Sequence, residues 1–353
     1  MTTSVTMHRE NEILEALLDE KSLSAYVVDL MTQVDPGSAE IINIPSFSAA
    51  TVRNVGTTAN GDTLTGKDVQ LSVDIKRYCN LQFDDRKATQ DLGGQYVKAL
   101  AGEAAADLAA DIDSNITDYL AYTVASGTAD SINPAGDTMN VTDLRNALAG
   151  IQAKRGYRPG DIRIVLSPWA CEGLKSGSTG WSTEHMAGGK ELGLGTIGLF
   201  DGNPVATSQY LPGSVANQKT LSVTDIAGDV SSLTATVAAG SGVVLGMKFN
   251  TRGFNDGSVY NDLTCDLVTS TTIGFTVSGS DFTPSAATLE STACANLVFA
   301  KSKVYHAAPW PFKVKMVDVS NNVATNVQVS ALYGRVAIAD GWVKRVFSPS
   351  GSI

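Results

Sequence analysis

The chain has 353 residues, 43% of them hydrophobic and 18% charged, which supplies enough apolar material for about two domains of ordinary size. Its formal net charge of −10 and its pI near 4.8 argue against a protein that grips nucleic acid through counterion release. No apolar run is long enough to span a membrane, and the first residues lack a signal-peptide core. We therefore expect a protein that is made and kept in the cytoplasm.

The first predicted element is a helical N-terminal arm over residues 9–31. Apolar side chains recur there at helical spacing, and Asp35-Pro36-Gly37 ends the segment. The apolar positions are Ile13, Leu14, Leu17 and Leu18.

Residues 68–84 alternate with a period of two, which predicts one long β-strand with an apolar face and a polar face. At roughly 3.3 Å per residue this strand would be about 50 Å long, more than one core of this chain can cover. We therefore expect a neighbouring copy of the protein to cover its far end. Arg77 alone interrupts the apolar row, which consists of Val69, Leu71, Val73, Ile75, Cys79, Leu81 and Phe83.

The preceding stretch, IINIPSFSAATVRNV, is strand-like, and GTTANGDTLTG after it has the glycine and asparagine content of a loop tip. Residues 46–84 are therefore predicted to form an extended β-hairpin that projects over a neighbouring subunit. The charged cluster at residues 84–87 is equally compatible with a solvated turn and with an orienting contact. The predicted assembly contacts are Arg53, Lys67, Val69, Leu71, Val73, Ile75, Asp84, Asp85, Arg86 and Lys87.

Residues 89–123 are predicted to form one long helix, because apolar residues recur there every four positions and alanine is frequent. Residues spaced four apart shift around the helix axis by about 40° per step. Successive segments of this apolar row should therefore pack against different partners. The pair Gly93-Gly94 predicts a kink near the start. The row consists of Leu92, Tyr96, Leu100, Ala104, Leu108, Ile112, Ile116 and Leu120.

The remainder of the chain changes character twice. Residues 142–215 predict mixed α/β structure, with Thr142 capping a helix, IRIVL as a buried strand and Ser167-Pro168 opening a second helix. Residues 216–296 are rich in Thr, Ser, Val and Gly and are acidic, which predicts an inserted β-rich subdomain. Residues 297–347 are again predicted to be ordered strands.

Residues that could carry catalysis or hold a metal are widely scattered. The motif Gly193–Gly198 matches G-x-G-x-x-G, but a dinucleotide site needs it between a strand and a helix, whereas here turn and strand residues follow. We expect no catalytic residue, metal site or cofactor, and a nucleotide-binding enzyme using this loop is a remote alternative. No C-x-x-C pair or metal-ligand spacing occurs among Cys79, Cys171, Cys265, Cys294, His8, His185 and His306.

The order of these elements resembles the HK97-like fold of tailed-phage major capsid proteins, which encapsulin nanocompartments share. The resemblance lies in INIPSF, GYRPGDIRIVLSPWACEGLK, GTIGLFDGNPVATSQYLPG and LYGRVAIADGW. It implies an α+β fold in six parts. These are an N-terminal arm (1–40), an extended β-hairpin loop with its base in a peripheral domain (41–88), a spine helix with the peripheral domain (89–140), an axial domain (141–215), the β-rich insertion (216–296), and an axial-domain return with a C-terminal peripheral-domain strand (297–353).

In its arrangement the chain is most similar to coat proteins of short-tailed phages. That resemblance implies a major capsid protein whose hexamers and pentamers close into an icosahedral shell around double-stranded DNA. It further implies a separate scaffolding protein, because the fold-like part begins near residue 41 and leaves no room for a fused scaffold. The resemblance also implies a portal protein at one vertex, and it is compatible with a decoration or cement protein on the shell. We expect no membrane partner and no crosslink between subunits. An encapsulin-type nanocompartment shell protein is the alternative. For the virion capsid itself, assembly in the host cytoplasm is expected.

Overall fold

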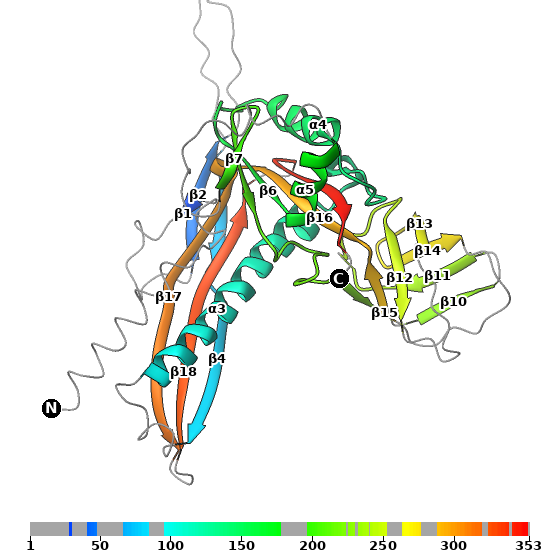
Figure 1. Cartoon of the computed structure of the whole chain (residues 1–353). Helices are drawn as coiled ribbons and strands as arrows, with labels where there is room; N and C mark the ends of the chain where they lie inside the picture. The colour runs from blue at the N-terminus through cyan, green and yellow to red at the C-terminus, as the bar shows by residue number, and fades with distance from the viewer. Residues whose placement is uncertain are drawn as a thin grey trace, which may run out of the picture. The chain divides into compact units, whose positions relative to one another are not determined.

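The computed structural model describes residues 28–29, 41–47, 66–84, 95–177, 196–223, 225–229, 232–239, 241–252, 263–276, 288–319, 324–338 and 341–351. This part is α+β, with few helices and with strands gathered into sheets of four, seven, six and two strands (Figure 1). Beyond residue 26 the chain forms two compact units. The first contains Val27–Ala109 and Val304–Ile338, and the second contains Ala110–Lys303 and Ala339–Ile353.

The first unit is built on a four-stranded sheet in the order β1-β17-β18-β4. Strands β17 (Val304–Val319) and β18 (Ala324–Ala337) form a long antiparallel hairpin. Strand β4 (Ile75–Asp84) pairs antiparallel with β18 over its whole length, and β1 (Val28–Asp29) lies parallel to β17. Strands β2 (Ile41–Phe47) and β3 (Gly66–Ser72) form a separate antiparallel pair.

The single strand predicted over residues 68–84 is wrong, because β3 and β4 are separated at Val73 and Asp74. Strand β3 pairs with β2, whereas β4 pairs with β18, so one alternating pattern is divided between two sheets. The alternation itself is confirmed, since Leu71 and Val73 are buried while every even-numbered residue from 68 to 80 is exposed. Alternation reports which face a side chain occupies, and it does not identify the partner strand.

The long helix predicted over residues 89–123 is confirmed where the chain is described. Helix α3 (Gln95–Asp118) continues into a π-helical turn, η3 (Tyr119–Val124), and Gly93-Gly94 lie outside the described residues. The division between the two units falls after Ala109, within this helix, so the two parts of the row belong to different units, as its drift predicted. The buried members of the row are Ala104, Leu108, Ile112, Ile116 and Leu120.

The second unit contains a six-stranded sheet covered by two helices, α4 (Val141–Gln152) and α5 (Pro168–Gly177). Leu144, Leu148 and Ile151 of α4 pack with Leu174 of α5 against buried strand residues such as Val298. The strand order is β5 (Ser131–Ile132), β19 (Val343–Pro349), β16 (Ala293–Ala300), β6 (Ile162–Leu166), β8 (Asn203–Thr207) and β7 (Thr196–Phe200).

The predicted strand IRIVL and the helix opened by Pro168 are confirmed as β6 and α5, but the predicted cap of α4 is wrong. The helix begins after Asn140, two residues before Thr142. The Asp143 backbone N–H donates to Asn140 Oδ1, and the Asn140 N–H donates to Asp143 Oδ2, both at 3.0 Å. Asn and Thr are both good capping residues, and the reciprocal carboxylate three positions on selects Asn140.

A seven-stranded antiparallel sheet accounts for the β-rich composition of residues 216–296. Alternate positions are buried, among them Leu221, Leu289 and Phe249, whose ring meets Phe275 edge to face at 5.9 Å. Its strand order is β10 (Asp225–Asp229), β11 (Ser232–Thr236), β14 (Thr272–Thr276), β13 (Leu263–Val268), β12 (Lys248–Arg252), β15 (Thr288–Ser291) and β9 (Thr220–Ser222).

The C-terminal strands are divided between the two units. The LYGRVA stretch lies in β18 and pairs with β4, in the first unit. The last strand, β19, pairs instead with β16 in the six-stranded sheet. The last described strand therefore lies in the second unit, because pairing between distant segments decides which sheet each strand joins.

Candidate assembly surfaces

The structure describes only part of the predicted contact set. Arg53, Asp85, Arg86 and Lys87 lie outside the described residues. Lys67 lies in β3 and Asp84 in β4, where the backbone alone is described. The side chains that can be examined are Val69, Leu71, Val73 and Ile75.

Two of these four side chains belong to the core of their own chain. Leu71 is 0% exposed and Val73 is 6% exposed, in a cluster with Ile44 of β2 and Ala307 of β17. At Gly334 of β18 an added Cβ would lie 2.2 Å from the Ser72 carbonyl oxygen, so β3 crosses directly against β18. Leu71 and Val73 are therefore already covered by their own chain, and a contact of this strand with a neighbouring subunit stays a prediction. Val69 and Ile75 are half-buried.

The outer edge of β4 is a candidate contact surface of the first unit. Strand β4 ends the sheet order, and no described strand pairs with its second edge. Such an edge offers unpaired N–H and C=O groups to another chain. Tyr78 is 65% exposed on this strand, flanked by the exposed Lys76 and Asn80 on the same face. Exposed aromatic side chains are enriched at protein interfaces, which makes this edge the candidate assembly surface.

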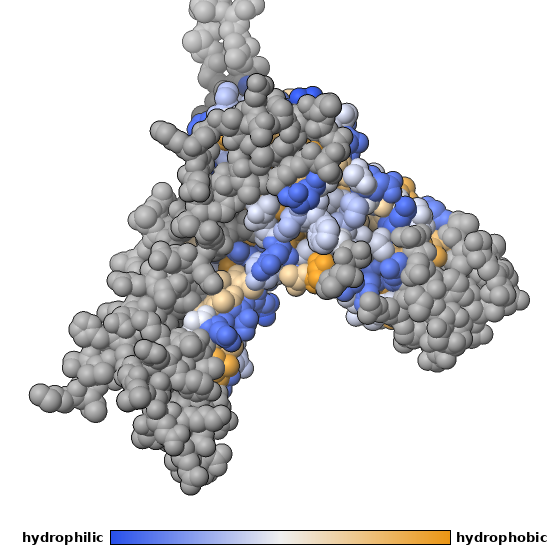
Figure 2. All heavy atoms as spheres, in the orientation of Figure 1, coloured by the Kyte–Doolittle hydropathy of each residue, from blue (hydrophilic) through white to orange (hydrophobic). Residues whose placement is uncertain are grey.

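Large apolar side chains are exposed at isolated points elsewhere in the described part of the chain. Figure 2 shows a mostly hydrophilic face there, with apolar residues in small separate spots. Apart from Tyr78, the exposed large apolar side chains of the whole described part, on whichever face, are Ile41, Trp169, Val215, Leu245 and Leu267. A contact through this face would therefore depend mainly on polar and charged groups.

Sequence reasoning missed a buried cation at the end of α3. Arg345 of β19 is 0% exposed, and its guanidinium donates to three carbonyl oxygens and one hydroxyl. The distances are 3.1 Å to Ala121 O, 2.7 Å to Gly242 O, 3.2 Å to Ser126 O and 2.7 Å to Ser131 Oγ. Burial lowers the pKa of Arg345 to about 10, so it remains charged at neutral pH.

Arg345 fixes the π-helical turn at the end of α3. In this turn the Ala125 N–H donates to Leu120 O at 2.9 Å, five residues back. Arg345 Cζ lies 5.6 Å and Lys219 Nζ 4.3 Å from the centre of the Tyr122 ring, and burial raises the pKa of Tyr122. The only sequence signal for this buried arginine is that two adjacent basic residues, Lys344 and Arg345, occur within the buried strand β19.

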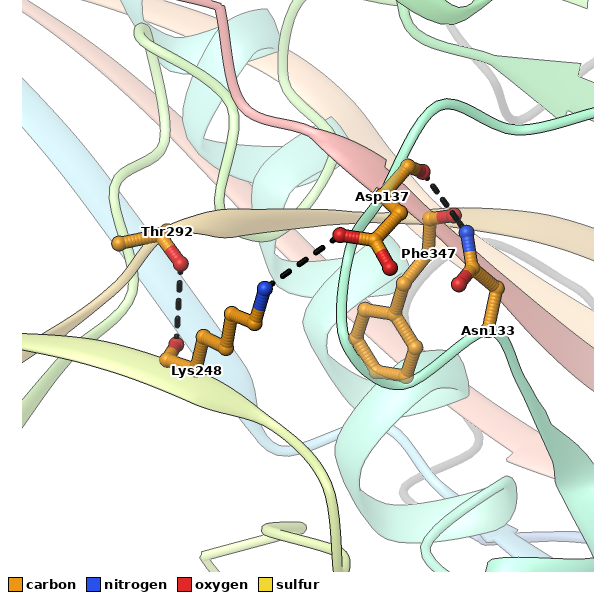
Figure 3. Close-up of polar contacts among 5 residues, drawn as sticks. All are labelled: Asn133, Asp137, Lys248, Thr292 and Phe347. Atoms are coloured by element: carbon orange, nitrogen blue, oxygen red, sulfur yellow. Dashed lines mark hydrogen bonds and ion pairs between the residues drawn. The ribbon is translucent and has the colours of Figure 1, made fainter. Parts of the chain in front are cut away.

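Polar contacts also tie the seven-stranded sheet to the rest of the second unit (Figure 3). Lys248 Nζ of β12 lies 3.4 Å from Asp137 Oδ1, and Thr292 Oγ1 donates to the Lys248 carbonyl oxygen at 3.2 Å. Asn133 Nδ2 donates to the carbonyl oxygens of Asp137 and Phe347, at 2.7 and 3.2 Å. Because Asp137 is largely exposed, the ion pair is worth less than about 1 kcal/mol, and the continuous chain from β15 into β16 supplies the main connection.

Two observations on the described residues concern metal and dinucleotide binding. They contain no group of three His, Cys, Asp or Glu side chains that could hold a metal ion. Thr196–Phe200 form strand β7, so the described part of the glycine motif enters a strand where a dinucleotide site needs a helix N-terminus. Within the same described ranges, no helix is long and apolar enough to cross a membrane.

The four thiols are expected to differ in reactivity. Cys171, Cys265 and Cys294 are buried, and burial raises the pKa of Cys265 to about 11 and that of Cys294 to about 12. Cys79 on β4 is half-buried. A thiol-specific reagent at pH 8 is expected to modify Cys79 alone in the native subunit and all four cysteines in denaturant, as measured by mass spectrometry. Rapid native labelling of Cys294 would contradict the placement of β16.

No protein-family model and no curated protein matches the sequence. Solved structures do match at a TM-score above 0.5. A structure from Mycobacterium phage Che8 has a TM-score of 0.52 and 15% identity, covering 94% of this chain and 93% of that one. The capsid of Ralstonia phage GP4 matches with a TM-score of 0.54 and 10% identity, covering 94% of this chain and 89% of that one. The capsid of Helicobacter pylori bacteriophage KHP30 matches with a TM-score of 0.53 and 13% identity, covering 92% of this chain and 87% of that one. The element order and these whole-chain matches show that the chain has the HK97-like fold of phage capsid structures.

Proposed function

We propose that this protein is a major capsid protein that assembles as hexamers and pentamers into an icosahedral shell around double-stranded DNA. The observation that carries the proposal is the fold match to the Ralstonia phage GP4 capsid over 94% of this chain. The proposal includes a scaffolding protein during assembly, a portal protein at one vertex, and assembly in the host cytoplasm before the shell becomes part of the virion.

In this proposal the protein acts through its shape and its surfaces, without catalysis. The β17–β18 hairpin and the β2–β3 pair give the first unit extended, hydrogen-bonded elements that can reach beyond one subunit's core. Repetition of modest contacts in a closed symmetric assembly makes the whole stable even when each contact is weak. A net charge of −10 suits a container that holds DNA without binding it tightly.

Sedimentation with electron microscopy tests the proposal. The protein is produced alone and together with the genes adjacent to its own, which would supply a scaffolding protein. We expect fast-sedimenting, uniform polyhedral particles in at least the second case. A species of one or a few subunits under both conditions would refute the shell, and a thermal shift on adding nucleotides would then support the enzyme alternative.

A further inference from the structure

The seven-stranded sheet begins and ends at the same ladder. Strand β9, which opens the sheet, pairs antiparallel with β15, which closes it, so that Thr220 lies opposite Glu290. The Ser291 N–H also donates to the Lys219 carbonyl oxygen at 3.0 Å. Opposite residues of an antiparallel pair are only about 5 Å apart. The chain therefore enters and leaves the sheet at nearly one point, as expected of a domain inserted into another.

The sheet has buried apolar side chains of its own. Phe249 of β12 meets Phe275 of β14 edge to face, and six of the seven strands contribute buried apolar residues. The core around α4 and α5 contains none of these side chains. A segment of about 70 residues with such a core is large enough to fold as a domain. The buried set is Leu221, Ala235, Phe249, Leu263, Cys265, Ile273, Phe275 and Leu289.

Within the described part of the chain, the strands of this sheet pack mainly against one another. No described helix or strand outside the sheet packs extensively against them. The six-stranded sheet of the same unit shares no described strand with it, so neither sheet needs the other to complete its hydrogen bonding. The Lys248–Asp137 ion pair between them contributes little, because Asp137 is largely exposed.

A close contact does join the segment between β11 and β12 to the end of α3. The Gly242 carbonyl oxygen accepts a hydrogen bond from Arg345 Nη1 at 2.7 Å. The φ of Gly242 is +72°, in the left-handed region, and a Cβ added there would overlap Tyr122, so this position requires glycine. Loss of the sheet would remove this acceptor from Arg345 and leave its other three acceptors in place.

We propose that residues 220–290 form a self-contained accessory module, which folds on its own core and is not needed to build the shell. The inference rests on the proposed function for the existence of a shell. Three observations support it: the paired ends of the segment, its separate set of buried side chains, and its limited packing against other described elements. The ladder between β9 and β15 is then a point at which the subunit tolerates an inserted domain.

Hydrogen exchange of the full-length subunit, measured by mass spectrometry, tests whether the module folds by itself. Phe275→Ala removes a buried side chain from the sheet, and Leu144→Ala is the matched substitution in the core around α4. We expect Phe275→Ala to speed exchange by on the order of tenfold in peptides from β11–β14 and to leave α4, β6 and β16 unchanged. Leu144→Ala should give the reverse pattern. Equal acceleration in both sets of peptides would overturn the proposal, and Ile273→Val is the milder variant if Phe275→Ala does not fold.

Excision tests whether the shell needs the module. Replacing residues 223–287 with Asn-Gly would close β9 onto β15 through a two-residue turn, because Ser222 already pairs with Thr288. The excised subunit is expected to form particles of wild-type size and yield, measured by sedimentation velocity and electron microscopy. Its urea midpoint should fall, since Arg345 loses the Gly242 carbonyl. Gly242→Ala, which keeps the module and strains only this contact, is the control for that loss.

A folded excised subunit that forms no particles, or particles of another size, would make the sheet part of the shell contacts and overturn the proposal. If the excised subunit does not fold, Phe275→Ala decides. Normal particles with fast exchange confined to the sheet would support the module, and loss of particles would refute it. If the wild type forms no particles under any condition, the proposed function fails, and the exchange experiment still tests whether the module folds by itself.

Discussion

Replacing Arg345 with methionine is expected to lower the free energy of unfolding by about 3–5 kcal/mol. Methionine fills much of the same space but donates no hydrogen bond, so the carbonyl oxygens of Ala121, Ser126 and Gly242 lose the donor they have in the native protein. A buried carbonyl left without a donor costs about 1–3 kcal/mol. The change is measured by urea unfolding of the unassembled subunit, followed by circular dichroism.

Two further variants distinguish the effect of the guanidinium hydrogen bonds from the effect of the positive charge. Arg345→Lys retains the charge but cannot reach four acceptors at once, so its loss of stability is expected to lie between that of wild type and Arg345→Met. Arg163→Met removes an arginine whose two acceptors, Gly160 O and Ile162 O, lie at a partly exposed turn, and should cost less than about 1 kcal/mol. If the Arg345→Met variant unfolds at the same urea concentration as the wild type, Arg345 does not stabilise the end of α3.

Replacing Leu71 with aspartate is expected to prevent folding of the first unit. Leu71 is 0% exposed between β2, β17 and β18, so an aspartate there would place a carboxylate in an apolar cluster without a described polar partner. Leu71→Ala, which only removes volume, should cost about 2–5 kcal/mol. Soluble yield and limited proteolysis of the purified subunit report the loss.

Tyr78→Asp is the matched control, because Tyr78 lies a few residues later on an exposed face. It should fold with wild-type melting behaviour and lower the yield of particles, since only the edge of β4 is changed. The opposite result for Leu71→Asp, a folded subunit without particles, would contradict its place in the core. A soluble, well-folded Leu71→Asp subunit that fails to assemble would mean that Leu71 contacts a neighbouring subunit, as the alternating pattern suggested before the fold was known.

The difference between these two residues shows how far the sequence can be interpreted. Alternation over residues 68–80 correctly separated covered from exposed positions, apart from the exposed Arg77, because side-chain direction in a strand is a local property with a period of two. It could not indicate that Leu71 is covered by β17 and β18 of its own chain, since those strands lie more than 200 residues further along. A buried face and an interface produce the same pattern.

By itself the sequence determined the local features of this protein: the face of each strand residue, the long helix with its buried row, β6, α5 and the β-rich composition of residues 216–296. The element order was enough to predict the HK97-like fold. Only the tertiary structure decided that β3 and β4 join different sheets, that β19 returns to the six-stranded sheet, and that Arg345 bonds to Ala121, 224 residues away. Periodicity records whether a position is buried, whereas pairing and buried polar networks depend on which distant segments the folded chain brings together.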